Sequence, residues 1–165
     1  MPTKKAIERA EEDKREGKSA STQAGEFVRD EIEKIRHGEH GARSAKQAIA
    51  IGLSEARRAG VDLKPPKKGK LSEKSQKSAE SAYEKGQRHE PVSPKRSRAR
   101  EKALKKESTE SASHEALSAQ AKSAAKSRTA ANRSAVAKKA VATKGLQELS
   151  KAGKKNARTQ KRHEA

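Results

Sequence analysis

The residues of this sequence that are best suited to chemistry are lysines and arginines, which gather in three clusters. The clusters are residues 65–70 (PPKKGK), residues 93–100 (SPKRSRAR) and a Lys/Ala tract over residues 122–155. Each Lys or Arg placed on a phosphate releases condensed counterions, so such clusters bind nucleic acid through charge density and carry little sequence information. The residues predicted to contact phosphate are Lys67, Lys68, Lys70, Lys95, Arg96, Arg98, Arg100, Lys122, Lys126, Arg128, Arg133, Lys138, Lys139, Lys151, Lys154, Lys155 and Arg158.

No group of residues predicts catalysis or a bound cofactor. His37 and His40 lie three apart in a loop bounded by glycines, but a zinc site needs three or four ligands held by supporting structure, so no metal site is predicted. Serine, histidine and acidic residues occur without a nucleophile elbow or a Gly-rich phosphate loop. Cysteine is absent, which excludes disulfides and thiolate chemistry. We therefore expect a protein that is not an enzyme.

The bulk composition indicates an anionic partner and a small core. The 165 residues carry a net charge of +19, and the sequence pI is about 10.3. Leu, Ile, Val and Phe make up 18 residues, about 11% of the chain, which is below the roughly 20% under which highly charged chains stay disordered. Because burial of apolar side chains must offset the entropy of ordering, we expect most of the chain to stay open or to take its order from a partner.

Charge and apolar residues divide the chain near Gly60. Thirteen basic and eleven acidic residues precede the division, and twenty-eight basic and eleven acidic residues follow it. Ten of the eighteen large apolar residues fall within residues 1–63, and Pro65 and Pro66 mark the edge. The sequence therefore predicts two parts, a small helical head at residues 1–63 and a basic tail at residues 64–165.

Three helices are predicted in the head from caps and from apolar residues at helical spacing. Each is bounded by a capping signal and a following glycine: Thr3 and Gly17, the cap cluster at residues 19–22 and Gly38, and Ser44 and Gly60. The predicted core comprises Phe27, Val28, Ile32, Ile35, Ile49, Leu53 and Val61. The predicted outer face of the second helix comprises Arg29, Asp30, Glu33 and Lys34. We expect a small helical hairpin of two to three helices. Because its core is small, this hairpin is expected either to have low stability or to be supported by self-association with a second copy.

The tail predicts a different kind of structure. From residue 118 to residue 163 only Glu148 is acidic, against nine Lys and four Arg. Ala and Lys favour helix, so residues 99–107 and 118–139 are helix-capable. Repulsion between like charges and the lack of an apolar stripe argue against stable helices in isolation. The predicted fold class is therefore all-α, with a small hairpin followed by a long, largely disordered tail that orders on a polyanion.

Residues 43–60 (RSAKQAIAIGLSEARRAG) resemble the recurrent core of a family of small, basic, uncharacterised bacterial proteins, which are sometimes labelled DNA-binding or histone-like. Residues 33–38 (EKIRHG) are similar to the helix end that precedes this motif in the family, and the resemblance covers roughly residues 20–62. It implies a bacterial source and a compact helical motif. The tail is similar in composition to Lys/Ala-rich bacterial proteins that resemble linker histones, and residues 93–96 (SPKR) are similar to short turns in linker-histone tails.

These observations predict non-sequence-specific nucleic-acid binding, with DNA preferred to RNA, by a histone-like or nucleoid-associated protein. The N-terminus lacks the apolar stretch of a signal peptide, and no run of about 18 apolar residues occurs, so we expect no membrane partner and a place in the cytoplasm, at the nucleoid. Within the head, the basic residues that either contact DNA or form a solvated helix face are Arg43, Lys46, Arg57 and Arg58. Two alternatives stay open: an RNA- or ribosome-associated accessory protein, and a protein-binding head with a solubilising tail.

Overall fold

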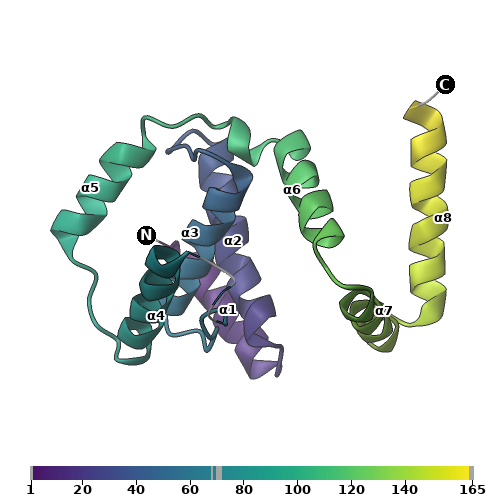
Figure 1. Ribbon diagram of the computed structural model, residues 1–165, viewed down its shortest axis with the longest axis horizontal. Coiled ribbons are helices and arrows are strands. Elements are labelled where there is room, and N and C mark those ends of the chain that lie inside the picture. The colour runs from purple at the N-terminus through teal and green to yellow at the C-terminus, as the bar shows by residue number, and fades with distance from the viewer. Residues whose placement is uncertain (1, 68, 70–71, 164–165) are drawn as a thin grey trace. The chain divides into compact units, whose positions relative to one another are not determined.

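The structure is a computed structural model that describes residues 2–67, 69 and 72–163. Within these residues the chain forms eight α-helices and one short 3-10 helix, η1 (Figure 1). Their bounds are α1 Lys4–Arg15, α2 Ala20–Arg36, α3 Ala45–Arg58, α4 Glu73–Gln87, α5 Pro94–Leu104, η1 Glu110–Ala112, α6 His114–Lys126, α7 Ala130–Lys144 and α8 Leu146–His163. The chain packs as two units, a first unit at Met1–Gln120 and a second unit at Ala121–Ala165. The division after residue 63, which was drawn from composition, stays a prediction.

The protein is all-α, but the prediction of a small hairpin followed by a largely disordered tail is wrong. Helices make up 72% of the chain, and α4 to α8 all lie after residue 64. Of the fifteen buried apolar residues in the described part of the chain, ten are alanines. A count of large aliphatic residues leaves alanine out, although alanine is both the strongest helix former and small enough to bury between helices. Composition therefore underestimated how much of this chain can be ordered.

The caps predicted for the head are confirmed. The side-chain oxygen of Thr3 accepts a hydrogen bond from Ala6 N at 3.2 Å and begins α1. Ser19 precedes α2 in the same role, and Ser44 accepts from Gln47 N at 3.2 Å at the start of α3. Each cap satisfies a backbone N–H that has no partner within its helix, so the three helices begin where the local sequence directs.

The predicted glycine stops are also confirmed. Gly17, Gly38 and Gly60 have φ angles of +73°, +75° and +89°, which only glycine adopts without strain. At the end of α3, Gly60 N donates to Arg57 O at 3.1 Å and Val61 N donates to Ala56 O at 3.1 Å. This is the Schellman arrangement, and it folds Val61 back onto the helix, where the side chain is buried.

Two apolar clusters form the core of the first unit. The first cluster comprises Ala10, Ala24, Phe27, Ala56 and Val61, with Ile7, Ala20, Leu53 and Leu63 packed against it. The second cluster comprises Ile32, Ile35, Ala42, Ala48 and Ala112, with Val28 and Leu117 packed against it. Of the predicted core residues, only Ile49 lies outside both clusters, and it is half-buried. Ala112 and Leu117 belong to the predicted tail, so residues of the predicted tail pack into the same core as residues of the predicted head.

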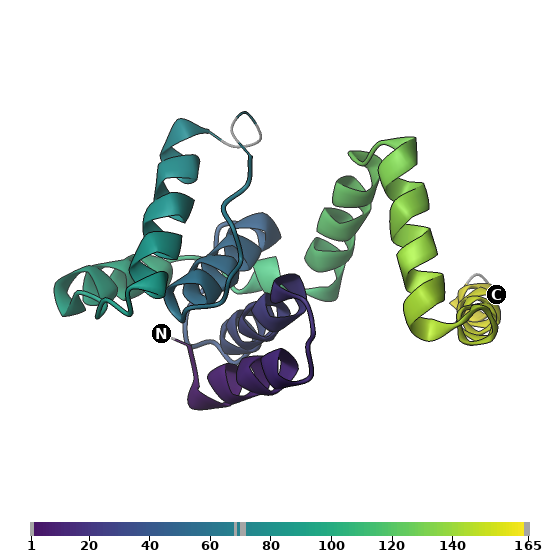
Figure 2. The same cartoon turned by 90° about the horizontal axis from the view of Figure 1, so that it is seen from below.

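Helices α1 to α4 lie side by side, with α2 against both α1 and α3, and α4 against α3 (Figure 2). At the crossing of α2 and α3 the chain has Gly52, where a Cβ would lie 2.7 Å from Val28 Cα. Gly86 of α4 lies against the backbone carbonyl of Arg57 in the same way. The Tyr83 hydroxyl donates to Asp62 Oδ1 at 2.6 Å, which adds a polar contact beside this packing. Glycine thus allows the backbones of α2, α3 and α4 to approach closely.

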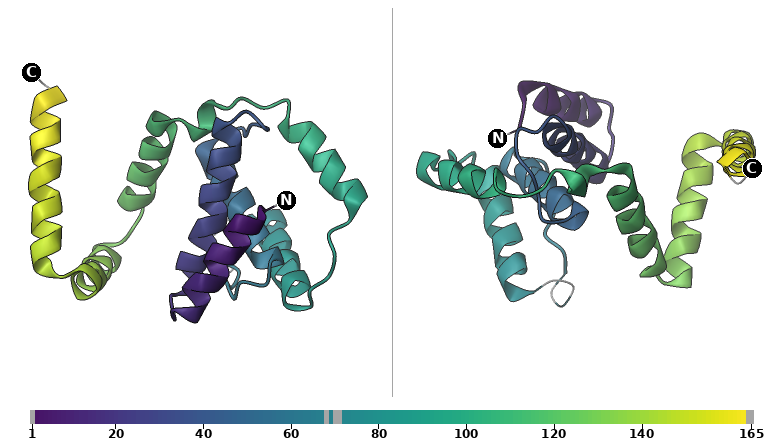
Figure 3. Two further views of the ribbon diagram at one scale, coloured as in Figure 1. Left: turned by 180° about the vertical axis from the view of Figure 1, so that it is seen from behind. Right: turned by 90° about the horizontal axis from the view of Figure 1, so that it is seen from above.

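The segment around η1 is tied to the head by backbone hydrogen bonds. Gly41 N donates to Leu104 O at 3.0 Å, and Ala42 N donates to Ser108 O at 3.0 Å. Arg36 Nε donates to Ala112 O at 3.0 Å, which fixes η1 beside the end of α2. These contacts fix the C-terminal end of α5, while the body of α5 stands apart from α1 to α4 in the views of Figure 3.

The second unit contains the end of α6 and all of α7 and α8. Thr129 caps α7 by accepting from Asn132 N at 3.2 Å, and Gly145, with a φ of +75°, separates α7 from α8. Helix α7 therefore begins at a side-chain cap, as the head helices do, and ends at a glycine with positive φ. No helix in the described part of the chain is both long enough and apolar enough to cross a membrane.

Candidate nucleic-acid interface

Every predicted phosphate-contacting residue whose side chain the structure describes is exposed. Those in the first unit are Lys67, Lys95, Arg96, Arg98 and Arg100. Those in the second unit are Lys122, Lys126, Arg128, Arg133, Lys138, Lys139, Lys151, Lys154 and Lys155. Lys68, Lys70 and the side chain of Arg158 lie outside the described residues. The structure therefore spreads the predicted residues over several helices and the segments between them, and their side chains are in solvent.

The C-terminal helix α8 gathers part of this charge on one face. Lys151, Lys154 and Lys155 are spaced three and four residues apart, which places them on the same side of an α-helix. Lys151 Nζ also lies 3.0 Å from Glu148 Oε1 one turn earlier, and both groups are exposed. In the sequence the same spacing continues with basic residues at 158, 161 and 162. The helix thus places these basic side chains in a row along one of its faces.

The second unit is strongly cationic, and its described side chains form no buried core. Residues 121–165 contain thirteen Lys or Arg and two Glu. None of its described side chains is buried, and Val136 and Val141 of α7 are 45% and 38% exposed. These helices therefore present mainly charged side chains to solvent, since none of their described side chains is buried in an apolar core.

The second basic cluster takes a helical form, and part of it lines a cavity. Residues 93–96 supply the N-cap and first turn of α5, with Pro94 at the first helical position, rather than an isolated turn. Arg96 and Arg100 line a cavity in the first unit. Lys95 and Arg98 of the same helix are exposed and do not line this cavity. The cluster is therefore divided between residues that line the cavity and residues that do not.

The basic residues singled out in the head have different environments. Arg43 is exposed, with its guanidinium 3.7 Å from Glu107 Oε1, and Lys46 is exposed as well. Arg57 was expected in solvent or on DNA, but it is only 7% exposed and its Nε donates to Leu63 O at 3.0 Å. Burial lowers the pKa of Arg57. This arginine supports the chain after α3 and cannot reach a phosphate.

Sequence reasoning missed a buried group of charged residues between α1, α2 and α3. Lys34 Nζ lies 2.6 Å from Asp30 Oδ2 and 4.0 Å from Glu55 Oε2. Thr3 donates to Asp30 twice, from its hydroxyl at 2.6 Å and from its backbone N–H at 3.2 Å. Burial acts to raise the pKa of Asp30, but the hydrogen bonds from Lys34 and Thr3 outweigh it, and the pKa is lowered. The prediction that Asp30 and Lys34 face solvent is wrong.

Glu31 is the most deeply buried charged residue of this group. Its side chain is 1% exposed, and its Oε2 lies 3.7 Å from His40 Nε2. Its other oxygen, Oε1, is buried without a hydrogen bond in the described part of the chain. Burial is the main cause that raises the pKa of Glu31, and Glu55 raises it further by repulsion. A charge pattern along one helix could not reveal this, because the partners come from other elements.

Comparison with known proteins finds a match to a family of unknown function over part of the chain. Residues 4–69 match the model of a family of unknown function, DUF6496. The matched residues span α1 to α3 and the segment after them, and they include the residues 20–62 that carry the resemblance noted above. No curated protein and no solved structure matches the chain. Among the described residues, no three His, Cys, Asp or Glu are grouped in a way that could hold a metal ion.

Proposed function

We propose that this chain binds nucleic acid without sequence specificity, DNA in preference to RNA, in the manner of a histone-like protein. The contacts come from the exposed lysines and arginines of the second unit, on the end of α6, on α7 and on α8. The observation that carries the proposal is the row of Lys151, Lys154 and Lys155 on one face of α8 in a unit with few acidic residues. Such a row suits a chain of phosphates better than it suits a neutral partner.

The helical form of the second unit supports this function in a second way. A disordered basic tail loses conformational freedom when it binds, and this loss weakens its affinity. Helices that already present their cations on one face lose less. A bound polyanion also cancels the repulsion between neighbouring lysines, so binding and helix formation in α7 and α8 stabilise each other.

The test is a salt titration of binding to duplex DNA, using the full chain and two triple variants with the same loss of charge. One variant carries Lys151→Gln, Lys154→Gln and Lys155→Gln. The matched control carries Lys4→Gln, Lys5→Gln and Lys14→Gln, which are exposed positions on α1 beside several acidic residues. Each lost phosphate contact flattens the plot of log affinity against log salt by about 0.9, so the α8 variant loses up to about 2.7 in slope.

The control variant is expected to keep the wild-type slope, and the α8 variant is expected to weaken on all DNA sequences alike. Equal losses from both variants would show that only total charge matters and would refute an interface on α8. Loss on one DNA sequence alone would refute non-specific binding. Competition with structured RNA tests the preference, and stronger competition by RNA than by DNA would favour an RNA- or ribosome-associated role.

A further inference from the structure

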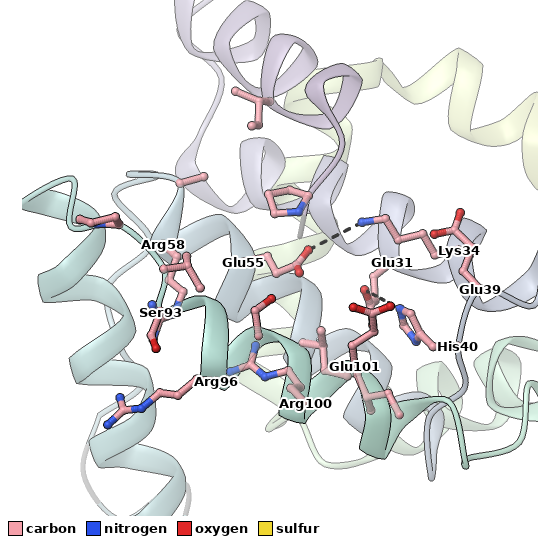
Figure 4. A pocket seen from close by; sticks show the side chains of 18 of the residues that line it. Glu31, Lys34, Glu39, His40, Glu55, Arg58, Ser93, Arg96, Arg100 and Glu101 are labelled. Carbon is pink, nitrogen blue, oxygen red and sulfur yellow. Dashed lines mark ion pairs between the residues drawn. The ribbon is translucent and has the colours of Figure 1, made fainter.

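The first unit contains a cavity of about 710 Å³ between α5 and the surface formed by α2, α3 and the end of α4 (Figure 4). This volume is within the range of about 300 to 1,000 Å³ that is usual for small-molecule sites. The phosphate contacts proposed for the second unit do not use it. Its lining contains charged residues at two places, and apolar residues as well.

The inner end of the cavity is acidic. Glu31 and Glu55 line it together with Lys34 and His40. Lys34 is already held by Asp30, with 2.6 Å between Nζ and Oδ2. The buried Glu31 Oε1 has no hydrogen-bond donor in the described part of the chain. A buried carboxylate oxygen without a donor destabilises the folded state, so a ligand that brings an N–H donor and a positive charge to this point gains affinity.

The outer wall of the cavity is basic. Arg58 of α3 and Arg96 and Arg100 of α5 line it, and Lys85 and Lys105 also belong to the lining. Figure 4 shows the three arginines around the cavity with the acidic residues of the inner end. Arginine is suited to carboxylate and phosphate groups because its planar guanidinium offers several donors in a fixed geometry.

Apolar side chains also line the cavity. They include Ile51 of α3, Leu104 of α5 and Val92 in the segment before α5. Leu104 is buried, so this part of the lining is fixed by the fold. An alkyl chain that spans the cavity would replace water on these surfaces, and the burial of its CH₂ groups would favour binding.

We propose that this cavity binds a small zwitterion, whose primary ammonium group pairs with Glu31 and whose carboxylate or phosphate pairs with Arg96 and Arg100. The two charged ends exclude simpler ligands. A simple anion would leave the carboxylate of Glu31 unsatisfied, and a polyamine would place a positive charge against the arginines of α5. A ligand with one charge of each sign, joined by an alkyl chain, satisfies both ends and the apolar lining.

The test is a titration of the full chain with ε-aminocaproate as the probe. Binding is measured from the shifts of backbone amide resonances in NMR spectra and by calorimetry. Caproate and hexylamine each lack one of its charged groups and serve as matched ligands. We expect saturable shifts at the cavity residues with ε-aminocaproate, and at least tenfold weaker binding of both matched ligands. Caproate binding as tightly as ε-aminocaproate would reduce the site to a simple anion site and overturn the proposal, as would the absence of saturable shifts with the zwitterion.

Variants locate the two charged ends. Glu31→Gln keeps the shape of the side chain and is expected to weaken ε-aminocaproate at least tenfold, and the double variant Arg96→Gln with Arg100→Gln is expected to do the same. The matched control is Lys95→Gln with Arg98→Gln, which removes the same charge from positions of α5 that do not line the cavity and is expected to leave binding unchanged. Because the arginine pair is exposed, that variant tests the cavity even if Glu31→Gln unfolds the chain. Binding that survives the arginine double variant, or is lost equally in the control, would refute the assignment.

Discussion

The crossing of α2 and α3 at Gly52 determines whether the first unit can pack as described, and Gly52→Ala tests it. An added Cβ would lie 2.7 Å from Val28 Cα, 2.9 Å from Val28 N and 3.0 Å from Phe27 O. All three are backbone atoms of α2, so no side-chain rotation can relieve the contacts. The two helices would have to separate, which opens gaps in the core around Phe27.

A matched substitution in α2, one of the two crossing helices, isolates this packing effect. Gly25 lies inside α2, and an added Cβ there meets nothing within 4 Å. Replacing Gly by Ala inside a helix favours folding by roughly 0.5 to 1 kcal/mol, and this gain applies equally to both positions. Overpacking of a filled core costs typically about 1 to 3 kcal/mol. We therefore expect Gly25→Ala to stabilise the chain, and Gly52→Ala to be about 1 to 3 kcal/mol less stable than Gly25→Ala.

Urea unfolding measures this difference. Far-ultraviolet circular dichroism follows all the helices, and the fluorescence of Tyr83, the chain's single tyrosine, follows the α3 and α4 region where its hydroxyl meets Asp62. The two variants should separate in midpoint by both probes, and in thermal unfolding by about 4 °C for each kcal/mol in a unit of this size. If Gly52→Ala proved as stable as Gly25→Ala, α2 and α3 would not cross at Gly52, and the packing described for the first unit would be wrong.

Two further predictions test the buried polar groups. Arg57→Leu removes the hydrogen bond from Nε to Leu63 O and is expected to lower the free energy of unfolding, measured in urea, by about 1 to 3 kcal/mol. The salt dependence of DNA binding is expected to keep the wild-type slope. A flatter slope with unchanged stability would contradict the buried position of Arg57. Because the pKa of Asp30 is lowered in the folded state, its contribution to stability is present above its unfolded pKa and is lost as pH falls through the folded pKa. Asp30→Asn should therefore be less stable than the wild type near neutral pH and converge with it in acid, as measured by urea midpoints across that range, and a constant difference would refute the ionic role of Asp30.

The ends of the first three helices could be predicted because their signals are local. A cap such as Ser44 acts on a backbone N–H three residues away, and a glycine such as Gly60 acts through its own φ angle. Both signals are complete within one short segment of sequence. For this reason the caps, the glycine stops and the buried Phe27 and Ile35 all agree with the structure.

The buried charges could not be predicted, because their partners are distant in sequence. Asp30 is buried by contact with Thr3, which lies 27 residues earlier. Helical periodicity shows that Asp30 and Lys34 share a face, but it does not show that α1 and α3 cover that face. The same limit applies to the cavity. Helix α5 supplies Arg96 and Arg100 to one wall because its last residue, Leu104, is hydrogen-bonded to Gly41, which is distant in sequence.

Alanine explains why the same residue types build two different units. In the first unit, alanines such as Ala48 and Ala82 are buried between helices, because a few large residues such as Phe27 and Ile35 provide enough apolar area to hold the helices together. In the second unit alanine still favours helix, but its described side chains include no buried residue, so the helices present their lysines to solvent. Placing or removing a few large apolar residues therefore decides whether an Ala/Lys-rich helix packs into a core or offers a charged face to a polyanion.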